Sequence, residues 1–433
     1  MLQSFIDTSR ISLVREMIYN VELPTISLKR IMKMQNRREQ QSNNQVFTGA
    51  IHKLFGMLRQ CQNSKKTQQP TGFLSISLKL DVTCSMDDYD DHSRNTRTSN
   101  PIWKHRNSAS YIAFDPETFT LPRVDCIVRF ETGGGRHFHP STYSVLCSAL
   151  PRLQTTCWDT TLPERRLPEL RRKIRSATVL ALNTVQLPAI VKFELNSNEY
   201  SPLNERLEIE AFVEPGEPDP MSPALRRIAV LPTLREFHVS VTPLSPDIFD
   251  FDFKSSDSLP NIVTLKLLLC STTADGRWYF TGSSSVADDR LERAYTPTED
   301  EETPAAFDSD DSDTSDYEPP FAWRRLNGEV PNDVFRNKGD PDTLSPFLIK
   351  LCDAVDNMPR LQQAEICLLS PNMTMEYLRA SEGAVQQQQH VGRWHITGMN
   401  GRDINKEWRF PVDVENALKG KDSANTVQLD RIE

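Results

Sequence analysis

Apolar residues recur along this chain in one short motif. In this motif, leucine or methionine followed by proline precedes an alternation of apolar and polar residues that is typical of a strand. The clearest copy is "LPTLREFHV" at 231–239. Alternate residues of a strand point to opposite faces, so the last two apolar positions of each copy share a face. The pattern predicts one short strand per copy. The other copies are "LPRLQTTCW" at 150–158, "LPAIVKFEL" at 187–195, "LPNIVTLKL" at 259–267 and "MPRLQQAEI" at 358–366.

Segments with helical spacing precede most of these strands. In "SPFLIKLCDAVDN" at 345–357, Leu348, Leu351 and Val355 recur at intervals that place them on one helix face. A serine followed by proline opens this segment and the one at 222–230, which predicts a helix cap at each serine. Further helices are expected at 46–60, 141–149 and 167–182.

Helix followed by strand, repeated in one direction, predicts an α/β fold with a largely parallel sheet and helices on one side. We interpret this as an irregular leucine-rich-repeat-like solenoid. The alternative is that the motif arises by chance in leucine-rich segments. Since loop-closure entropy grows slowly with length, the strand at 361–367 is expected beside that at 262–268 despite the long separation.

The expected organisation has four parts. Residues 1–283 form the repeat-like region, with an earlier strand in "FLSISLKLDV" at 73–82 and a polar loop at 83–108. Residues 284–341 form a disordered acidic insertion, because their charge and proline content oppose packing. Residues 342–412 hold the final repeat and a closing hairpin, and 413–433 a flexible tail.

Acidic residues are concentrated in the insertion. Segment 299–318 holds ten of them and no lysine or arginine, so the formal charge of −9 becomes +1 without it. A nearly neutral remainder argues against nucleic-acid binding, which needs clustered positive charge. Thr298 and Ser315 each have an acidic residue three positions later, which suits acidophilic kinases, although the insertion can equally be a solubilising loop.

We expect an intracellular protein of the cytoplasm or nucleus, because no secretory signal is visible and the cysteines are placed like buried thiols. The N-terminus shows no basic stretch followed by an apolar core, and the longest apolar run, "LKLLLC" at 265–270, is too short to span a membrane. No C-x-x-C pair occurs among the eight cysteines, and six of them fall in expected strands or helices. That placement is typical of buried thiols in a reducing compartment.

Catalytic motifs are weak, and neither an enzyme nor a cofactor is predicted. "ETGGGRHFHP" at 131–140 lacks the spacing of a phosphate loop. His137 and His139 could share a metal, which keeps a metal-dependent enzyme as an alternative, but no third ligand has a recognisable spacing. "GRWYFTG" at 276–282 and "GRWHITG" at 392–398 are interpreted as glycine turns that lead into strands with a buried tryptophan. The basic residues at 165–175 are expected on the polar face of a helix.

Protein binding is predicted on the uncovered side of the sheet. Where apolar residues of a strand face the covering helices, the intervening residues project from the opposite face. This mixed-charge band suits a polar protein surface, although an idle solvated face is the alternative. The band comprises Lys192, Glu194, Glu236, His238, Thr264, Lys266, Gln363 and Glu365.

Several of these segments resemble a group of uncharacterised filamentous-fungal proteins that contain an F-box domain. The resemblance covers roughly 10–283 and 342–412 and is carried by "LDVTCSMDDYD", "RHFHPSTYSVLCSALPRLQ", "DGRWYFTG" and "FLIKLCDAVDNMPRLQQAEICL". It implies an N-terminal F-box that docks the adaptor of a cullin–RING ubiquitin ligase. It also implies a leucine-rich-repeat-like region that holds a protein substrate.

The F-box itself is expected to be absent from this chain. "LPTISLKRIM" at 23–32 lacks the acidic residue after proline that an F-box would have, and "MIYNVELP" is interpreted as a strand. We therefore expect the ligase adaptor as a partner only if an F-box lies upstream. The alternative function is a free-standing intracellular scaffold or decoy that binds a protein without a ligase.

Overall fold

The computed structural model divides the chain into two compact units after Ile190. Unit 1 covers the described residues up to Ile190 together with 321–324, and unit 2 covers those from Val191 to Gly282 and from Arg325 onward. This differs from the single region expected for 1–283. The structure describes residues 14–27, 30, 35–66, 75–85, 106–107, 109–114, 120–133, 135–197, 199, 202–252, 260–282, 321–330, 335–336, 338–368, 373–379, 392–398, 410–420 and 426–430.

Unit 1 is built on a parallel sheet with strand order β1-β2-β4-β6. Aromatic rings join its helices to that sheet: Phe138 lies 5.7 Å from Phe47 and 5.8 Å from Tyr143, which stacks on Trp158 at 5.4 Å. The elements are β1 (Glu16–Leu23), α3 (Arg37–Lys66), β2 (Ile76–Cys84), β3 (Tyr111–Ile112), β4 (Ile127–Gly133), β5 (His137–Phe138), α5 (Pro140–Ser148), β6 (Thr155–Asp159) and α6 (Pro168–Thr184).

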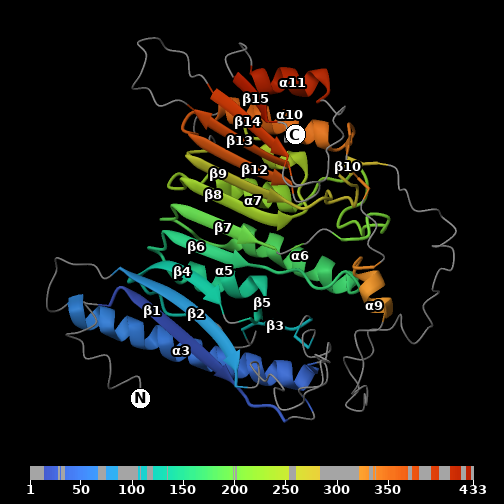
Figure 1. Cartoon of the computed structure of the whole chain (residues 1–433). Helices are drawn as coiled ribbons and strands as arrows, with labels where there is room; N and C mark the ends of the chain where they lie inside the picture. The colour runs from blue at the N-terminus through green and yellow to red at the C-terminus, as the bar shows by residue number, and fades with distance from the viewer. Residues whose placement is uncertain are drawn as a thin grey trace. The chain divides into compact units, whose positions relative to one another are not determined.

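Unit 2 carries the larger sheet, in the order β7-β8-β9-β12-β13-β14-β15 (Figure 1). The first four strands are parallel, β13 runs antiparallel to both β12 and β14, and β15 is parallel to β14. The strands are β7 (Lys192–Asn196), β8 (Glu236–Thr242), β9 (Thr264–Leu269), β12 (Gln363–Leu368), β13 (Met373–Arg379), β14 (Gly392–Gly398) and β15 (Thr426–Asp430). Its helices are α7 (Met221–Ala229), the 3-10 turn η2 (Pro246–Phe249), α10 (Leu344–Asn357) and α11 (Val412–Lys419).

The expected mixed α/β fold with a largely parallel sheet is confirmed, and so is the pairing of the last repeat strand. Gln363 of β12 lies opposite Thr264 of β9, although almost one hundred residues separate them in the chain. The apolar positions predicted to share a face are buried, with exposed fractions of 2% or less. They are Phe193, Leu195, Phe237, Val239, Leu265, Leu267, Ala364 and Ile366.

The recurrent Leu-Pro motif forms a turn that immediately precedes a strand. The N–H of Leu234 donates to the carbonyl of Leu231 at 3.0 Å, so Pro232 occupies the second position of a four-residue turn. Proline is favoured there because its fixed φ matches the turn. The first apolar residue of the motif therefore lies in the turn, one or two residues before the strand. The same bond closes the turns Leu150–Leu153, Leu187–Ile190 and Met358–Leu361.

A repeated main-chain bond then sets the register of unit 2. The carbonyl of Val191 accepts from the N–H groups of Arg235 and Glu236, and that of Arg235 accepts from Val263 and Thr264. The carbonyl of Val263 accepts in the same way from residues 362 and 363. The first residues of β7, β8, β9 and β12 are therefore paired directly with one another.

Helix starts differ from the serine caps that were predicted. Helix α7 begins at Met221, and the carboxylate of Asp219 accepts from the Met221 N–H and the Ser222 hydroxyl. Asp340 takes the corresponding place before α10 by accepting from the N–H of Thr343. An aspartate upstream is the stronger acceptor at a helix N-terminus because it is charged.

The flexible tail predicted for 413–433 is wrong. Helix α11 spans Val412–Lys419, with Val414 and Leu418 buried, and β15 pairs with β14. Two apolar positions four residues apart were too short a signal to predict a helix that is stabilised by packing.

The end of the predicted disordered insertion is also ordered. Residues 283–320 lie outside the described residues, but α9 (Phe321–Leu326) is helical and β11 (Lys338–Gly339) pairs with β10 (Phe280–Thr281). The buried Glu205 carboxylate accepts hydrogen bonds from the backbone N–H groups of Phe335 and Arg336. The segment before α10 is therefore fastened to unit 2 by contacts that the local sequence does not reveal.

We predict that Glu205→Ala destabilises the folded protein by about 1–3 kcal/mol, because two backbone N–H groups lose their acceptor. Urea unfolding followed by circular dichroism measures this loss. The matched control is Glu208→Ala, which removes an exposed carboxylate three residues away. Equal stability of the two variants would contradict this role of Glu205.

Candidate functional site

The structure brings the eight predicted binding residues together on one face of the unit 2 sheet, which we call the open face. Register aligns them in two rows, each with one residue from β7, β8, β9 and β12. The first row is Lys192, Glu236, Thr264 and Gln363, and the second is Glu194, His238, Lys266 and Glu365.

Neighbouring charges on the open face are paired, both across strands and within β7. The Lys266 ammonium lies 2.8 Å from the Glu365 carboxylate, and this hydrogen bond raises the pKa of Lys266. Lys192 lies 3.8 Å from both Glu194 and Glu236. These side chains remain about one-third to two-fifths exposed, so each pair is open to water and contributes little to stability.

His238 is more enclosed than the lysines and glutamates of the open face. Its side chain is 12% exposed, and Nδ1 lies 3.8 Å from the Glu194 carboxylate. Nε2 is buried and has no hydrogen-bond partner among the described residues. The ring therefore fills the centre of the second row instead of projecting from it.

The open face extends beyond the residues that were predicted. On β13, Glu376 lies directly opposite Glu365, and His395 of β14 lies opposite Glu376 with 3.9 Å between Nδ1 and Oε2. Leu378, 51% exposed, and Arg393 continue the first row. The alternation of "MTMEYLR" at 373–379 was the available signal, but nothing in the sequence gave its register.

His137 and His139 do not form a metal site with the described residues. His137 lies in β5, and His139 caps α5, where its Nδ1 accepts from the Ser141 N–H at 3.3 Å. No group of three or more histidine, cysteine, aspartate or glutamate side chains suited to a metal occurs in the described part of the chain. Burial lowers the pKa of both histidines, and Asp159 partly offsets this for His137.

Both Gly-Arg-Trp motifs place a buried tryptophan, although only one forms a regular strand. Trp394 lies in β14 and is fully buried, 5.1 Å from the ring of Tyr377. Trp278 follows Gly276, whose φ of +79° favours glycine, and forms an isolated bridge with Thr272. The Arg336 guanidinium covers the Trp278 ring. Neither ring is free to stack on a ligand.

The basic run at 165–175 is not a uniform polar face. Arg171 and Arg175 are buried, with exposed fractions of 3% and 5%, and Arg171 donates to the carbonyl of Pro163 at 2.7 Å. Arg172 is exposed and pairs with Glu169 at 2.6 Å. Helical spacing alone could not separate these roles, because the burial of Arg171 depends on its contact with the preceding loop at Pro163.

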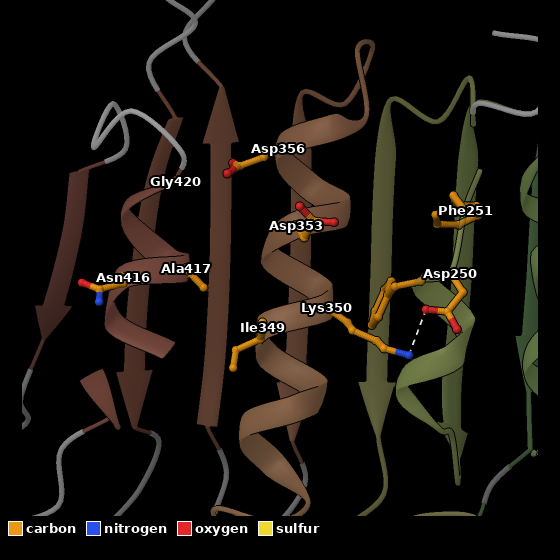
Figure 2. A pocket seen from close by; sticks show the side chains of 10 residues that line it. Asp250, Phe251, Ile349, Lys350, Asp353, Asp356, Asn416, Ala417 and Gly420 are labelled. Carbon is orange, nitrogen blue, oxygen red and sulfur yellow. Dashed lines mark ion pairs between the residues drawn. The ribbon is translucent and has the colours of Figure 1, made fainter. Parts of the chain in front are cut away.

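A groove of about 450 Å³ lies on the helical side of unit 2, between η2, α10 and α11. In Figure 2, Lys350 of α10 points toward Asp250, and Asp356 projects on the other side of the helix, toward α11. Phe249, Phe251, Ile349 and Ala417 supply apolar lining, and Asp353 supplies a further carboxylate. The sequence analysis missed this groove, because its lining comes from three segments that only folding brings together.

The remaining expectations are limited by what the structure describes. Thr298 and Ser315 lie outside the described residues, as does most of the predicted loop at 83–108. All eight cysteines are free thiols, and none is exposed. Among the described helices, none has both the length and the apolar character needed to cross a bilayer.

Comparisons with family models, with curated proteins and with solved structures found no match to this chain.

We predict that Lys266→Glu destabilises the protein by up to about 1 kcal/mol, because two glutamates would then face each other across β9 and β12. Adding Glu365→Lys restores the opposite-charge pair and should recover most of that loss. Thermal unfolding of wild type, both single variants and the double variant forms the complete cycle. Additive losses in the double variant would show that the two side chains do not interact.

We predict that stability falls as the pH is lowered through about 6.5, the ordinary pKa of histidine. His137 and His139 have lowered pKa values in the folded protein, so the unfolded chain binds protons first and is favoured by acid. Urea unfolding at about pH 7.5 and about pH 5.5 measures the slope. His137→Gln should make the dependence shallower, and an unchanged slope would contradict the prediction.

Proposed function

We propose that the open face of unit 2 binds a protein. The observation that carries this proposal is the in-register array of both signs of charge over β7, β8, β9 and β12. A polar and partly exposed sheet surface matches the composition of non-obligate protein interfaces better than it matches a small-molecule site. Paired acidic side chains also disfavour a phosphate backbone as the ligand.

Within this proposal the chain is the substrate-recognition part of an F-box-type ubiquitin-ligase receptor in the cytoplasm or nucleus. The turn and strand recur in unit 2, with α7 between β7 and β8 and α10 immediately before β12. This arrangement supports the interpretation as a leucine-rich-repeat-like region. The resemblance to F-box-containing proteins supports the ligase link. Adaptor binding itself would require an F-box, and no part of the open face has that role.

Affinity capture from fungal cells tests the proposal with a tagged full-length chain. The open-face variant combines Glu194→Lys, Glu236→Lys and Lys266→Glu. Its matched control, Glu169→Lys, Glu208→Lys and Arg172→Glu, changes the net charge equally at exposed positions outside the open face. Circular dichroism and thermal unfolding establish that both variants fold.

We expect proteins captured by wild type and by the control variant to be lost from the open-face variant. Recovery of the ligase adaptor together with those proteins supports the receptor proposal, whereas their recovery without the adaptor favours a free-standing scaffold. Capture of the same proteins by all three folded chains would exclude the open face as the binding surface.

A further inference from the structure

Strand β1 of unit 1 has a neighbour on one side only, among the strands that the structure describes. It pairs in parallel with β2 over all eight of its residues, and the sheet ends with β1. Since the N–H of Ser77 in β2 donates to the carbonyl of Arg15, the backbone groups of every second residue from Arg15 face β2. The N–H and C=O groups of the intervening residues therefore point out of the sheet. These residues are Glu16, Ile18, Asn20 and Glu22.

This edge has few of the features that keep an edge strand from pairing with another chain. The strand "EMIYNVEL" contains no proline and no lysine, and its register with β2 is continuous, without a bulge. Within the described part of the chain, no residue donates to or accepts from its outward backbone groups. Ile18 is also 62% exposed. An edge with free backbone groups and an apolar side chain beside them can accept one more strand.

The other face of β1 packs on α3, which runs along it (Figure 1). Val21 is buried there, and the Tyr19 hydroxyl donates to the Ala50 carbonyl at 3.2 Å. These contacts fix β1 before any partner arrives, so the edge is a preformed template. Met17 is half-buried on this face, and the exposed Val46 lies one helical turn before Ala50. Apolar side chains of an added strand would find matching surface here.

Charge distinguishes the possible occupants of this edge. Glu16 and Glu22 are exposed on the same face as Ile18, and neither forms an ion pair with a described residue. A second copy of this chain would bring its own two glutamates to the edge, where like charges destabilise strand pairing. A strand with basic residues opposite both glutamates and a β-branched residue opposite Ile18 complements the edge instead.

We propose that β1 binds an extended, basic segment of a protein partner as an additional antiparallel strand. The two backbones exchange hydrogen bonds through the outward groups of Ile18 and Asn20, and these bonds supply affinity. Basic side chains opposite Glu16 and Glu22 set the register, and an apolar side chain lies beside Ile18. Antiparallel pairing is slightly more stable per residue than parallel pairing. The surface belongs to unit 1 and is therefore distinct from the open face.

Fluorescence polarisation tests the proposal with the full-length protein and the fluorescein-labelled peptide Lys-Val-Thr-Leu-Val-Val-Lys. In the proposed register the first lysine lies opposite Glu22, the fifth residue opposite Ile18 and the last lysine opposite Glu16. Antiparallel geometry turns the amide of the fifth residue toward β1 and that of the sixth residue away from it. N-methylation of the fifth residue therefore removes a donor to β1, and N-methylation of the sixth is the matched control.

Two protein variants test the same contact from the other side. The charge variant is Glu16→Lys with Glu22→Lys, and its matched control, Glu169→Lys with Glu208→Lys, changes the net charge equally at exposed positions outside β1. Ile18→Pro removes one outward N–H and leaves the hydrogen bonds to β2 in place, since proline is compatible with an edge strand. Circular dichroism and thermal unfolding establish that each variant folds.

We expect saturable binding of the peptide to wild type and to the control variant. The charge variant, Ile18→Pro and N-methylation of the fifth residue should each weaken binding at least about fivefold. Glutamates in place of both peptide lysines should restore binding to the charge variant, because they recreate opposite-charge pairs across the strands.

Three results would each overturn the proposal: equal binding of the two methylated peptides, unchanged binding by the folded charge variant, or no saturable binding to wild type. Size-exclusion chromatography supplies a further test. A dimer of the full-length protein that Ile18→Pro dissociates would also overturn the proposal, because a second copy would then occupy the edge. None of these outcomes involves the open face of unit 2, so the two proposals can fail separately.

Discussion

The two-residue period of a strand is the constraint on which unit 2 depends. Each parallel strand buries one set of alternate side chains beneath the helices, so the other set must lie on the opposite face. A slip of one residue would carry Phe237 and Val239 into water and His238 into the core. The Leu-Pro turns and the shared carbonyls of Val191, Arg235 and Val263 hold the strands against such a slip.

This register also explains the chemistry of the open face. Residues that are distant in the chain become direct neighbours, so charges must alternate or be compensated across strands. Lys266 compensates Glu365, and Lys192 lies between two glutamates. Where Glu365 meets Glu376, two like charges lie opposite each other, and each has a basic side chain on its outer side. The surface is therefore a consequence of strand pairing and not of any local motif.

The helical side of unit 2 follows a different rule. Helices α10 and α11 each bury one stripe of residues. Their outward-facing residues are not constrained by pairing with a residue on a neighbouring strand. That freedom allows η2, α10 and α11 to gather carboxylates and apolar groups around one groove. The two faces of unit 2 consequently offer different chemistry: an array of mixed charge on one side, and a groove lined by both charged and apolar side chains on the other.

The sequence by itself determined the strands that follow the Leu-Pro turns, their buried positions and the eight residues of the open face. It could do so because periodicity and proline geometry are local properties. Only the tertiary structure decided that Glu376 and His395 extend this face, that Arg171 and Arg175 are buried, and that Val412–Lys419 forms a helix and Thr426–Asp430 a strand. These features depend on contacts between segments far apart in the chain, and such contacts leave no periodic trace in any one of them.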